Sequence, residues 1–224
     1  MNLTNPWSRH SPDLMFKHLV GFDFGSNPEL QLNEIRAHKA GIAQMILSKL
    51  AVSKEDTILD LGSGCGFIAN PISQSVENVI CCDISISFIE FAKKECSHKN
   101  NITFQLIKDF DLGGILDSSL AAAYSYNVFI HLNLFQMYWY LQALAKKIRL
   151  GGRLVFDITN ANNLEKNVSD FFITFAENFK KNPEDRDACV CWNSPQAVIG
   201  LAKDAGFNLI ENIEDSFFVF ERKT

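Results

Sequence analysis

The sequence has fewer basic than acidic residues. Lysine and arginine number 21 against 26 aspartates and glutamates, which leaves the 224 residues with a net charge of −5. A chain with this balance has no surplus of cations to neutralise a phosphate backbone, so nucleic acid is not an expected partner. Long apolar runs are also missing, since none reaches the roughly 18 residues of a membrane span, and the first residues lack the pattern of a secretory signal. We therefore expect a protein of the cytoplasm with no membrane partner.

Cysteine pairs at the spacing of a zinc knuckle are absent as well. The six cysteines are Cys65, Cys81, Cys82, Cys96, Cys189 and Cys191. The second and third lie in "VICCDI", a run typical of a buried strand, in which cysteine behaves as a small hydrophobic residue. Cys189 and Cys191 supply too few ligands for a tetrahedral zinc ion. The sequence predicts reduced thiols and no metal site.

From Thr57 onward, short apolar or β-branched runs alternate with longer helical ones. This alternation is typical of a parallel sheet with crossover helices. We expect strands at residues 57–61, 78–82, 102–106, 121–125, 153–158, 207–213 and 216–222. We expect helices at 66–75, 86–98 and 134–148, and one in "SPQAVIGLAKDAGF" that Ser194 caps and Gly206 ends. The sequence therefore predicts an α/β fold.

Two segments depart from this alternation. Residues 1–52 form a predicted N-terminal helical cap, with a helix capped by Asn27 and apolar through Ile35, Ile42, Ile46 and Leu50. Residues 53–224 form the main domain, with a helical insertion at about 160–192. In the insertion Phe171, Phe175 and Phe179 share one helical face. That face either packs on a core of its own or forms a lid over a pocket at the sheet edge.

A glycine-rich turn, "ILDLGSGCGF", joins the first strand to the first helix. Its backbone N–H groups and the helix N-terminus are expected to face a bound ligand, and its glycines allow that ligand close to the backbone. A dinucleotide-binding turn would need glycine at position 67, which is Phe67, and the third glycine comes at Gly66 instead. This spacing argues against an oxidoreductase that uses NAD or FAD.

The segment from Asp60 to Gly66 resembles the acid-x-G-x-G-x-G motif of the class I S-adenosylmethionine-dependent methyltransferases. The likeness continues over about residues 55–160, through a second strand ending in Asp83, then "KDFD", "AAYSYNVFIHL" and "KKIRLGGRLVFDI". The resemblance implies a Rossmann-like, doubly wound sheet of seven mostly parallel strands, the last one antiparallel. It also implies an enzyme that uses S-adenosylmethionine and releases S-adenosylhomocysteine.

The resemblance assigns contacts with the cofactor to residues at the strand ends. Asp83 is placed to accept both ribose hydroxyls, and Asp60 to hold the methionine amino group. Their alternative roles are an ordinary strand-end acid and a cap for the turn. Asp109 is placed to accept the adenine amino hydrogen, unless Asp111 shifts the register. The remaining expected contacts are with the turn, the adenine ring and the methionine part: Gly62, Ser63, Gly64 and Gly66; Ile84 and Phe110; Tyr126 and Asn127.

The chemistry implied by the resemblance needs no enzyme nucleophile, because the sulfonium already activates the methyl group. A hydroxyl or protonated amine must lose a proton, and His131 after the fourth strand is the candidate base. The alternative is that His131 packs or caps the next helix. Tyr126 is a candidate to orient the acceptor. His18, Arg36 and His38 come from the N-terminal segment, and Arg36 either binds a carboxylate of cofactor or substrate or lies on the surface.

The acceptor class is constrained mainly by what the chain lacks. A metal-assisted mechanism needs acids at the ends of the fourth and fifth strands, and only Asp157 qualifies. An adenine methylase would show an N/D-P-P-Y-type stretch where this chain reads "SYNVF". We therefore expect methyl transfer to an oxygen or nitrogen of a small molecule. The alternatives are a protein or RNA methyltransferase and a non-catalytic S-adenosylmethionine-binding protein, and neither the acceptor nor the oligomeric state is predicted.

Overall fold

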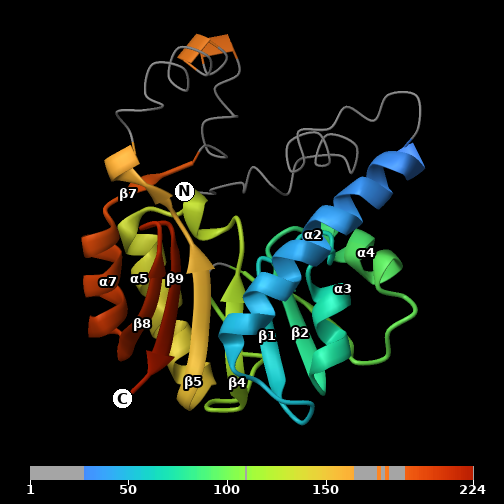
Figure 1. The fold of residues 1–224 in the computed structure, drawn as a ribbon, viewed down its shortest axis with the longest axis horizontal. Coiled ribbons are helices and arrows are strands. Elements are labelled where there is room, and N and C mark those ends of the chain that lie inside the picture. Colours follow the sequence, from blue (N-terminus) through green and yellow to red (C-terminus); the bar gives the residue numbers. More distant parts are fainter. Residues whose placement is uncertain (1–27, 109, 164–175, 178–179, 182–189, 224) are drawn as a thin grey trace.

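A seven-stranded sheet runs through the part of the chain that the computed structural model describes, residues 28–108, 110–163, 176–177, 180–181 and 190–223. The strands lie in the order β3-β2-β1-β4-β5-β9-β8 (Figure 1). Their bounds are β1 Thr57–Leu61, β2 Asn78–Asp83, β3 Ile102–Leu106, β4 Leu120–Ser125, β5 Ile148–Asp157, β8 Phe207–Ile213 and β9 Phe217–Arg222. The predicted doubly wound architecture is confirmed.

One strand runs against the other six. The β1–β2, β1–β4, β2–β3 and β4–β5 pairs are parallel, whereas β9 is antiparallel to both of its neighbours, β5 and β8. The connection between β8 and β9 is a tight turn in which Glu214 and Asp215 have φ values of 51° and 53°. A turn this short joins antiparallel strands, because a parallel pair needs a crossover of a dozen or more residues. The last strand is antiparallel, as predicted.

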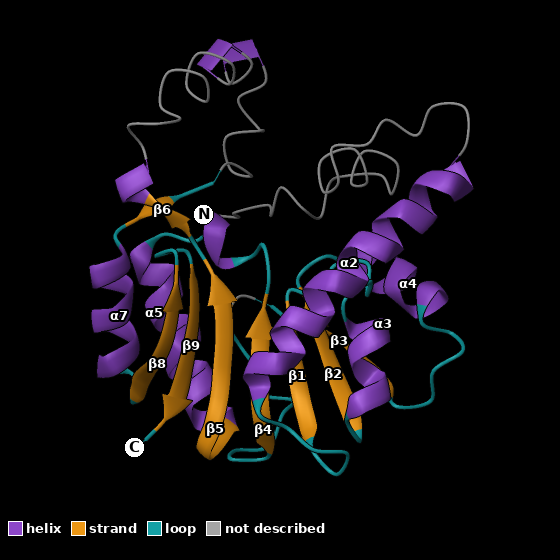
Figure 2. Cartoon of the chain, in the orientation of Figure 1, coloured by secondary structure: helices purple, strands orange, loops and turns teal. Residues whose placement is uncertain are grey.

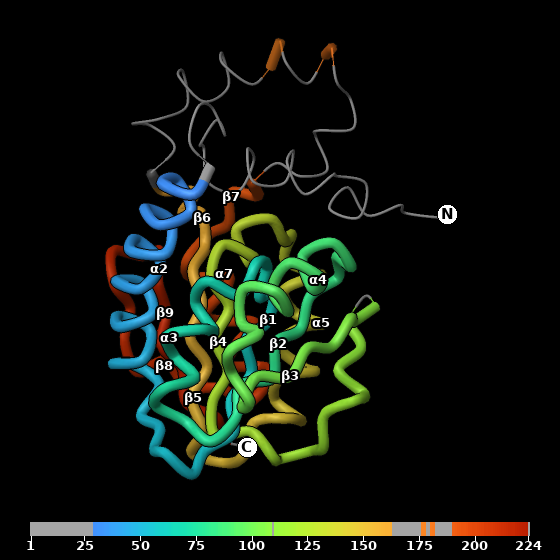
Figure 3. The backbone as a smooth tube through the Cα atoms, turned by 90° about the vertical axis from the view of Figure 1, so that its right-hand side faces the viewer, coloured from blue at the N-terminus to red at the C-terminus, as the bar shows by residue number. Residues whose placement is uncertain are grey.

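Helices cover both faces of the sheet (Figures 2 and 3). Their bounds are α2 Pro28–Leu50, α3 Ala69–Ile72, α4 Ile86–Glu95, α5 Leu134–Lys147 and α7 Pro195–Asp204. One buried cluster joins α2 and α3 to the sheet and the other joins α5 and α7 to it. Along β1, Ile58 belongs to the first cluster, and Leu59 and Leu61 belong to the second. This alternation follows from the two-residue repeat of a strand.

Several element boundaries differ from the predicted ones, and two of these differences have a clear structural cause. The helix predicted at 66–75 begins at Ala69 and continues as a 3-10 turn over Ser73–Ser75. Gly66 has a φ of 79°, a conformation that no helical residue adopts, so a helix cannot begin before it. The fifth strand begins at Ile148 rather than 153, because the chain pairs with β4 directly after α5 and then makes a register shift beside Gly151.

A small parallel sheet of β6 Thr159–Asn160 and β7 Trp192–Asn193 was not predicted. It joins the two ends of the segment that the sequence marks as a helical insertion. The Cys191 amide donates to the Ile130 carbonyl and the Asn193 side chain donates to the Leu132 carbonyl. The proposed aromatic face of Phe171, Phe175 and Phe179 lies outside the described residues, as do Asn27 and His18.

In the part of the chain that the structure describes, no helix is both long enough and apolar enough to cross a bilayer.

Candidate active site

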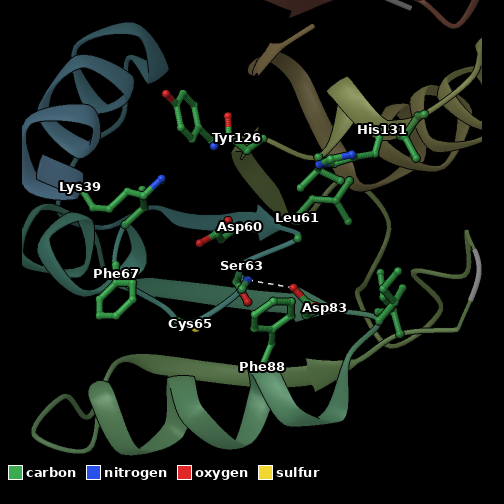
Figure 4. Close-up of a pocket in the computed structure, with 18 of the residues that line it drawn as sticks. Lys39, Asp60, Leu61, Ser63, Cys65, Phe67, Asp83, Phe88, Tyr126 and His131 are labelled. Carbon is green, nitrogen blue, oxygen red and sulfur yellow. Dashed lines mark hydrogen bonds between the residues drawn. The ribbon is translucent and has the colours of Figure 1, made fainter. Parts of the chain in front are cut away.

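A cavity opens at the carboxyl ends of β1, β2 and β4 (Figure 4). From β1 the strand order runs through β2 and β3 in one direction and through β4 and β5 in the other. This edge is therefore the topological switch point, the place where open α/β sheets bind ligands. The cavity is lined by the glycine turn, by the ends of β1 and β2, by α2, and by the residues after β4.

The glycine turn is tied to the neighbouring strand. The amides of Gly62 and Ser63 both donate to the Cys82 carbonyl, at 2.7 Å and 3.0 Å. The Gly64 amide donates to a carboxylate oxygen of Asp83 at 2.8 Å. These three amides are therefore not directed at a ligand, and that part of the sequence prediction is wrong. The reason is that the end of β2 lies beside the turn, so the Cys82 carbonyl and the Asp83 carboxylate accept the hydrogen bonds of these amides.

The glycines of the turn meet different requirements. Gly62 has a φ of 75°, and a Cβ there would lie 2.2 Å from a Val128 methyl carbon. Gly64 has a φ of 52°, and a Cβ there would meet nothing within 4 Å. Gly66 does not line the cavity, because it packs against Ala92 of α4 and Cys96 beyond it. The predicted contact of Gly66 with the cofactor is therefore corrected to a packing role.

Asp83 is held from two sides at the end of β2. One carboxylate oxygen accepts from the Gly64 amide and the other accepts from the Ser85 amide, each at 2.8 Å. Burial raises the pKa of Asp83 to about 6, while these amide bonds act in the opposite direction. Each carboxylate oxygen still has a lone pair to offer. The side chain lines the cavity as an oriented pair of acceptors, which suits a vicinal diol.

Asp60 lies across the turn, at the end of β1. It accepts a hydrogen bond from the hydroxyl of Tyr124 at 2.8 Å and none from the amides of the turn, so it does not cap the turn. Burial raises the pKa of Asp60 to about 7, the Tyr124 bond lowers it and the charge of Asp83 raises it further. A cationic group in the cavity would favour the charged form of Asp60.

Apolar and aromatic side chains make up much of the cavity lining. Ile84 lines the cavity as predicted, together with Phe88, Ile107 and Tyr140. Phe110 does not line the cavity, because its ring packs against Trp139 and Tyr140 with centroids 4.9 Å and 4.8 Å apart. Tyr140, which the sequence interpretation did not single out, lines the cavity, and Asp109 lies outside the described residues.

Tyr126, Asn127 and His131 line the cavity from the segment after β4, as predicted. The Asn127 amide donates to a carboxylate oxygen of Asp157 at 2.8 Å, which places this segment against the end of β5. His131 ends a 3-10 turn, Phe129–His131, whose buried Phe129 ring stacks on Phe156 with centroids 4.3 Å apart. The sequence thus brings both candidate catalytic side chains to the cavity.

The N-terminal helix contributes a residue that the sequence interpretation missed. Lys39 of α2 lines the cavity, one helical turn after Ile35, which also lines it. Arg36 instead makes two bonds to Glu95, at 2.7 Å and 2.8 Å, and neither Arg36 nor His38 lines the cavity. The signal was present, because Ile35 was recognised as part of the apolar helix face and Lys39 lies four residues further on that face.

Residues 58–152 match the family model described as "Methyltransferase domain". This stretch of the chain is therefore a methyltransferase domain. Together with the sheet topology, the match confirms the predicted class, the class I S-adenosylmethionine-dependent methyltransferases. A search of curated proteins by sequence gave no match.

Solved structures resemble this chain over most of its length. The geranyl diphosphate C-methyltransferase of Streptomyces coelicolor A3(2), crystallised with Mg2+, geranyl diphosphate and S-adenosyl-L-homocysteine, is 13% identical with a TM-score of 0.67; the match covers 96% of this chain and 95% of that one. A chain from the complex of the Haloferax volcanii Trm112 methyltransferase activator with a methyltransferase is 16% identical with a TM-score of 0.66, covering 89% and 95%. Magnesium protoporphyrin IX methyltransferase from Synechocystis PCC 6803, with bound SAH, is 16% identical with a TM-score of 0.62, covering 84% and 83%. At these identities the likeness establishes the fold alone.

Histidine, cysteine and acidic side chains are the usual ligands of a protein-bound metal ion. Within the described residues no group of three histidines, cysteines or acids could hold a metal ion. Cys65, Cys81, Cys82 and Cys96 are free, buried thiols. The Cys191 thiol donates to the His131 carbonyl at 3.5 Å, and Cys189 lies outside the described residues.

Proposed function

We propose that the methyltransferase transfers the methyl group of S-adenosylmethionine to an oxygen or nitrogen of a small-molecule acceptor by in-line displacement. The observation that carries this proposal is the pairing of Asp83 and Asp60 across the glycine turn. Asp83 offers two oriented acceptors for the ribose hydroxyls, and buried Asp60 offers a negative charge for the methionine amino group. Both side chains line one cavity at the switch point of a methyltransferase fold.

The cofactor supplies the activated methyl group, and the protein aligns the acceptor with it. Correct alignment of two reactants lowers a barrier by roughly 7–11 kcal/mol. In this proposal His131 accepts the proton of the acceptor and Tyr126 orients it, since both line the cavity from the segment after β4. The apolar wall of Ile84, Phe88 and Ile107 reduces the access of water to the adenine end.

Several observations favour a small acceptor. The net charge is −5, so the chain has no cationic excess with which to bind RNA. Two of the structural neighbours carry small molecules in their names, geranyl diphosphate and magnesium protoporphyrin IX. A protein or RNA acceptor is the alternative, because another neighbour is found in a complex with a methyltransferase activator. A non-catalytic binding protein is the third candidate.

The domain division and the location are also proposals. We divide the chain into a cap at residues 1–52 and a methyltransferase domain at 53–224, with its insertion at about 160–192, and we place the protein in the cytoplasm. The described part of the cap is α2, which contacts α3, β4 and β5.

The test is calorimetric titration with S-adenosylmethionine, S-adenosylhomocysteine and NAD. The wild type is expected to bind the first two and not NAD. Because Asp83→Ala removes charged hydrogen bonds to the ribose, it should weaken binding by about 10–100-fold or more. Absence of binding of both adenosyl ligands to the wild type would overturn the proposal.

Two further variants separate binding from folding. Asp83→Asn keeps the side chain's shape and one acceptor oxygen for the backbone, so it should fold and still bind S-adenosylhomocysteine more weakly than the wild type. Glu90→Gln removes an exposed acid of α4 that does not line the cavity and should leave binding unchanged. Activity with a pool of metabolites, lost in His131→Ala, would exclude the non-catalytic candidate.

A further inference from the structure

Lys39 brings a positive charge into a cavity whose other fixed charges are negative. Among the described residues that line the cavity, it is the one lysine or arginine. Figure 4 shows its side chain extending from α2, with the ammonium group in the space between Asp60 and Tyr126. Its Nζ atom lies 5.1 Å from the centroid of the Tyr126 ring, which is within the range of a cation–π contact. The position of the ammonium is therefore defined by the aromatic ring.

Among the described residues, none forms a direct ion pair that would neutralise the charge of Lys39. In the described part of the chain Lys39 forms no salt bridge, whereas Arg36 on the same helix is paired with Glu95. Burial lowers the pKa of Lys39, and the charge of Asp157 acts against this effect. A partly buried ammonium without a bound counter-ion is stabilised when an anionic ligand reaches it.

The two ends of the cavity differ in a way that orients the cofactor. Figure 4 shows Asp60 and Lys39 on one side of the cavity and Phe88 beside Asp83 on another, and the apolar side chains of Ile84 and Ile107 also line the cavity. An α-amino acid group carries its ammonium and its carboxylate on the same carbon. A site for this group needs an acid and a base close to each other, whereas a site for adenine needs apolar walls.

We infer that Lys39 binds the carboxylate of the cofactor's methionine part while Asp60 binds the ammonium of the same group. This inference rests on the proposed function, and it adds a cofactor-binding residue from the N-terminal helix to those of the sheet. It also explains how α2 closes the methionine end of the cavity.

The inference is tested with two ligands that differ by the amino acid group. S-adenosylhomocysteine carries it, and 5′-deoxy-5′-methylthioadenosine has the same adenosine and thioether without it. Lys39→Met should weaken the binding of S-adenosylhomocysteine by about 10–100-fold, because the variant loses a hydrogen bond between charged groups. The same variant should leave the affinity for methylthioadenosine unchanged, and Lys39→Arg should retain most of the affinity for S-adenosylhomocysteine.

Arg36→Met is the matched control, because it removes a cation from the same helix without altering the lining of the cavity. It should bind both ligands as the wild type does. An equal loss of affinity for both ligands in Lys39→Met would show that Lys39 only supports the fold. Unchanged affinity for S-adenosylhomocysteine would show that Lys39 does not bind the carboxylate of the cofactor. Either result overturns the inference. Failure of the wild type to bind either ligand would instead overturn the proposed function.

Discussion

The two walls of the cavity are held in place by different kinds of contact. The wall made by the ends of β1 and β2 is fixed by backbone groups, since Gly62, Ser63 and Gly64 all donate to β2 or to Asp83. The opposite wall, with Lys39 and the segment after β4, is shaped largely by side chains, including the contact of Lys39 with the Tyr126 ring. The first wall is therefore preorganised for one ligand, and the second can change its specificity by single substitutions.

His131→Ala sharpens this comparison most, because it removes a candidate base from the second wall only. Loss of general base catalysis typically costs about 100–10,000-fold in turnover. We expect a fall of that size in methyl transfer to an acceptor found by screening, with the affinity for S-adenosylhomocysteine unchanged. Turnover and calorimetric affinity are to be measured on the same preparation, with Tyr126→Phe beside it. If turnover stays at the wild-type level, His131 packs the structure and is not the base.

Gly62→Ala is expected to destabilise the wall made by the ends of β1 and β2. Its φ of 75° and the 2.2 Å approach to Val128 mean that a methyl group brings both backbone strain and a steric clash. We expect the free energy of unfolding to fall by about 3 kcal/mol or more, measured by chemical denaturation. Gly64→Ala is the control, with a cost of about 1–2 kcal/mol, because a Cβ there meets nothing within 4 Å. Equal losses would mean that Val128 moves away freely.

The pH dependence of cofactor binding tests the acid in the first wall. Burial raises the pKa of Asp60 to about 7 in the empty protein, and binding of a cationic amino group requires the ionised form. Affinity for S-adenosylhomocysteine should therefore be about tenfold higher at pH 8 than at pH 6. Asp60→Asn should flatten this dependence, while a residual slope is expected from Asp83, whose pKa is about 6.

The same acids predict how stability changes with pH. Asp60 and Asp83 have folded-state pKa values above their usual value of 3.8. Between about pH 4 and pH 7 these two acids therefore bind more protons in the folded protein than in the unfolded chain, and their contribution to stability falls as the pH rises. Denaturation of the ligand-free protein and of Asp60→Asn at pH 5 and pH 8 checks this sign. The variant should lose less stability than the wild type between the two pH values, and an equal or larger loss in the variant would contradict the prediction.

The smallest effect is expected from an ion pair outside the cavity that links the helix of the second wall to α4. Arg36 of α2 pairs with Glu95 of α4, and 41% of the Arg36 side chain is exposed. Solvent screens the Arg36 end of the pair, whereas the Glu95 side chain is only 7% exposed, so Arg36→Met should lower the free energy of unfolding by about 1 kcal/mol. Chemical denaturation measures the change. A larger loss would show that this pair, and not the packing of α2 on the sheet, holds the second wall.

The features that the sequence predicted well are local or periodic. The strands at 57–61, 102–106 and 207–213 have the predicted bounds, because an apolar run of the right length needs no distant partner to be recognised. Asp60 and Asp83 were found because they lie at the carboxyl ends of such runs. Boundaries were missed where a distant or conformational constraint decided them, as at the start of α3 and at the register shift in β5.

The sequence by itself determined the order of the elements, the glycine turn and the acids at the ends of β1 and β2, all of which depend on neighbours in the chain. The tertiary structure decided that Asp83 binds the Gly64 amide, that Tyr124 supports Asp60, and that Tyr140 and not Phe110 lines the cavity. It also decided that Lys39 rather than Arg36 enters the cavity. These contacts depend on packing between residues far apart in the chain, and local sequence patterns do not specify which side chain occupies a given position in the packed structure.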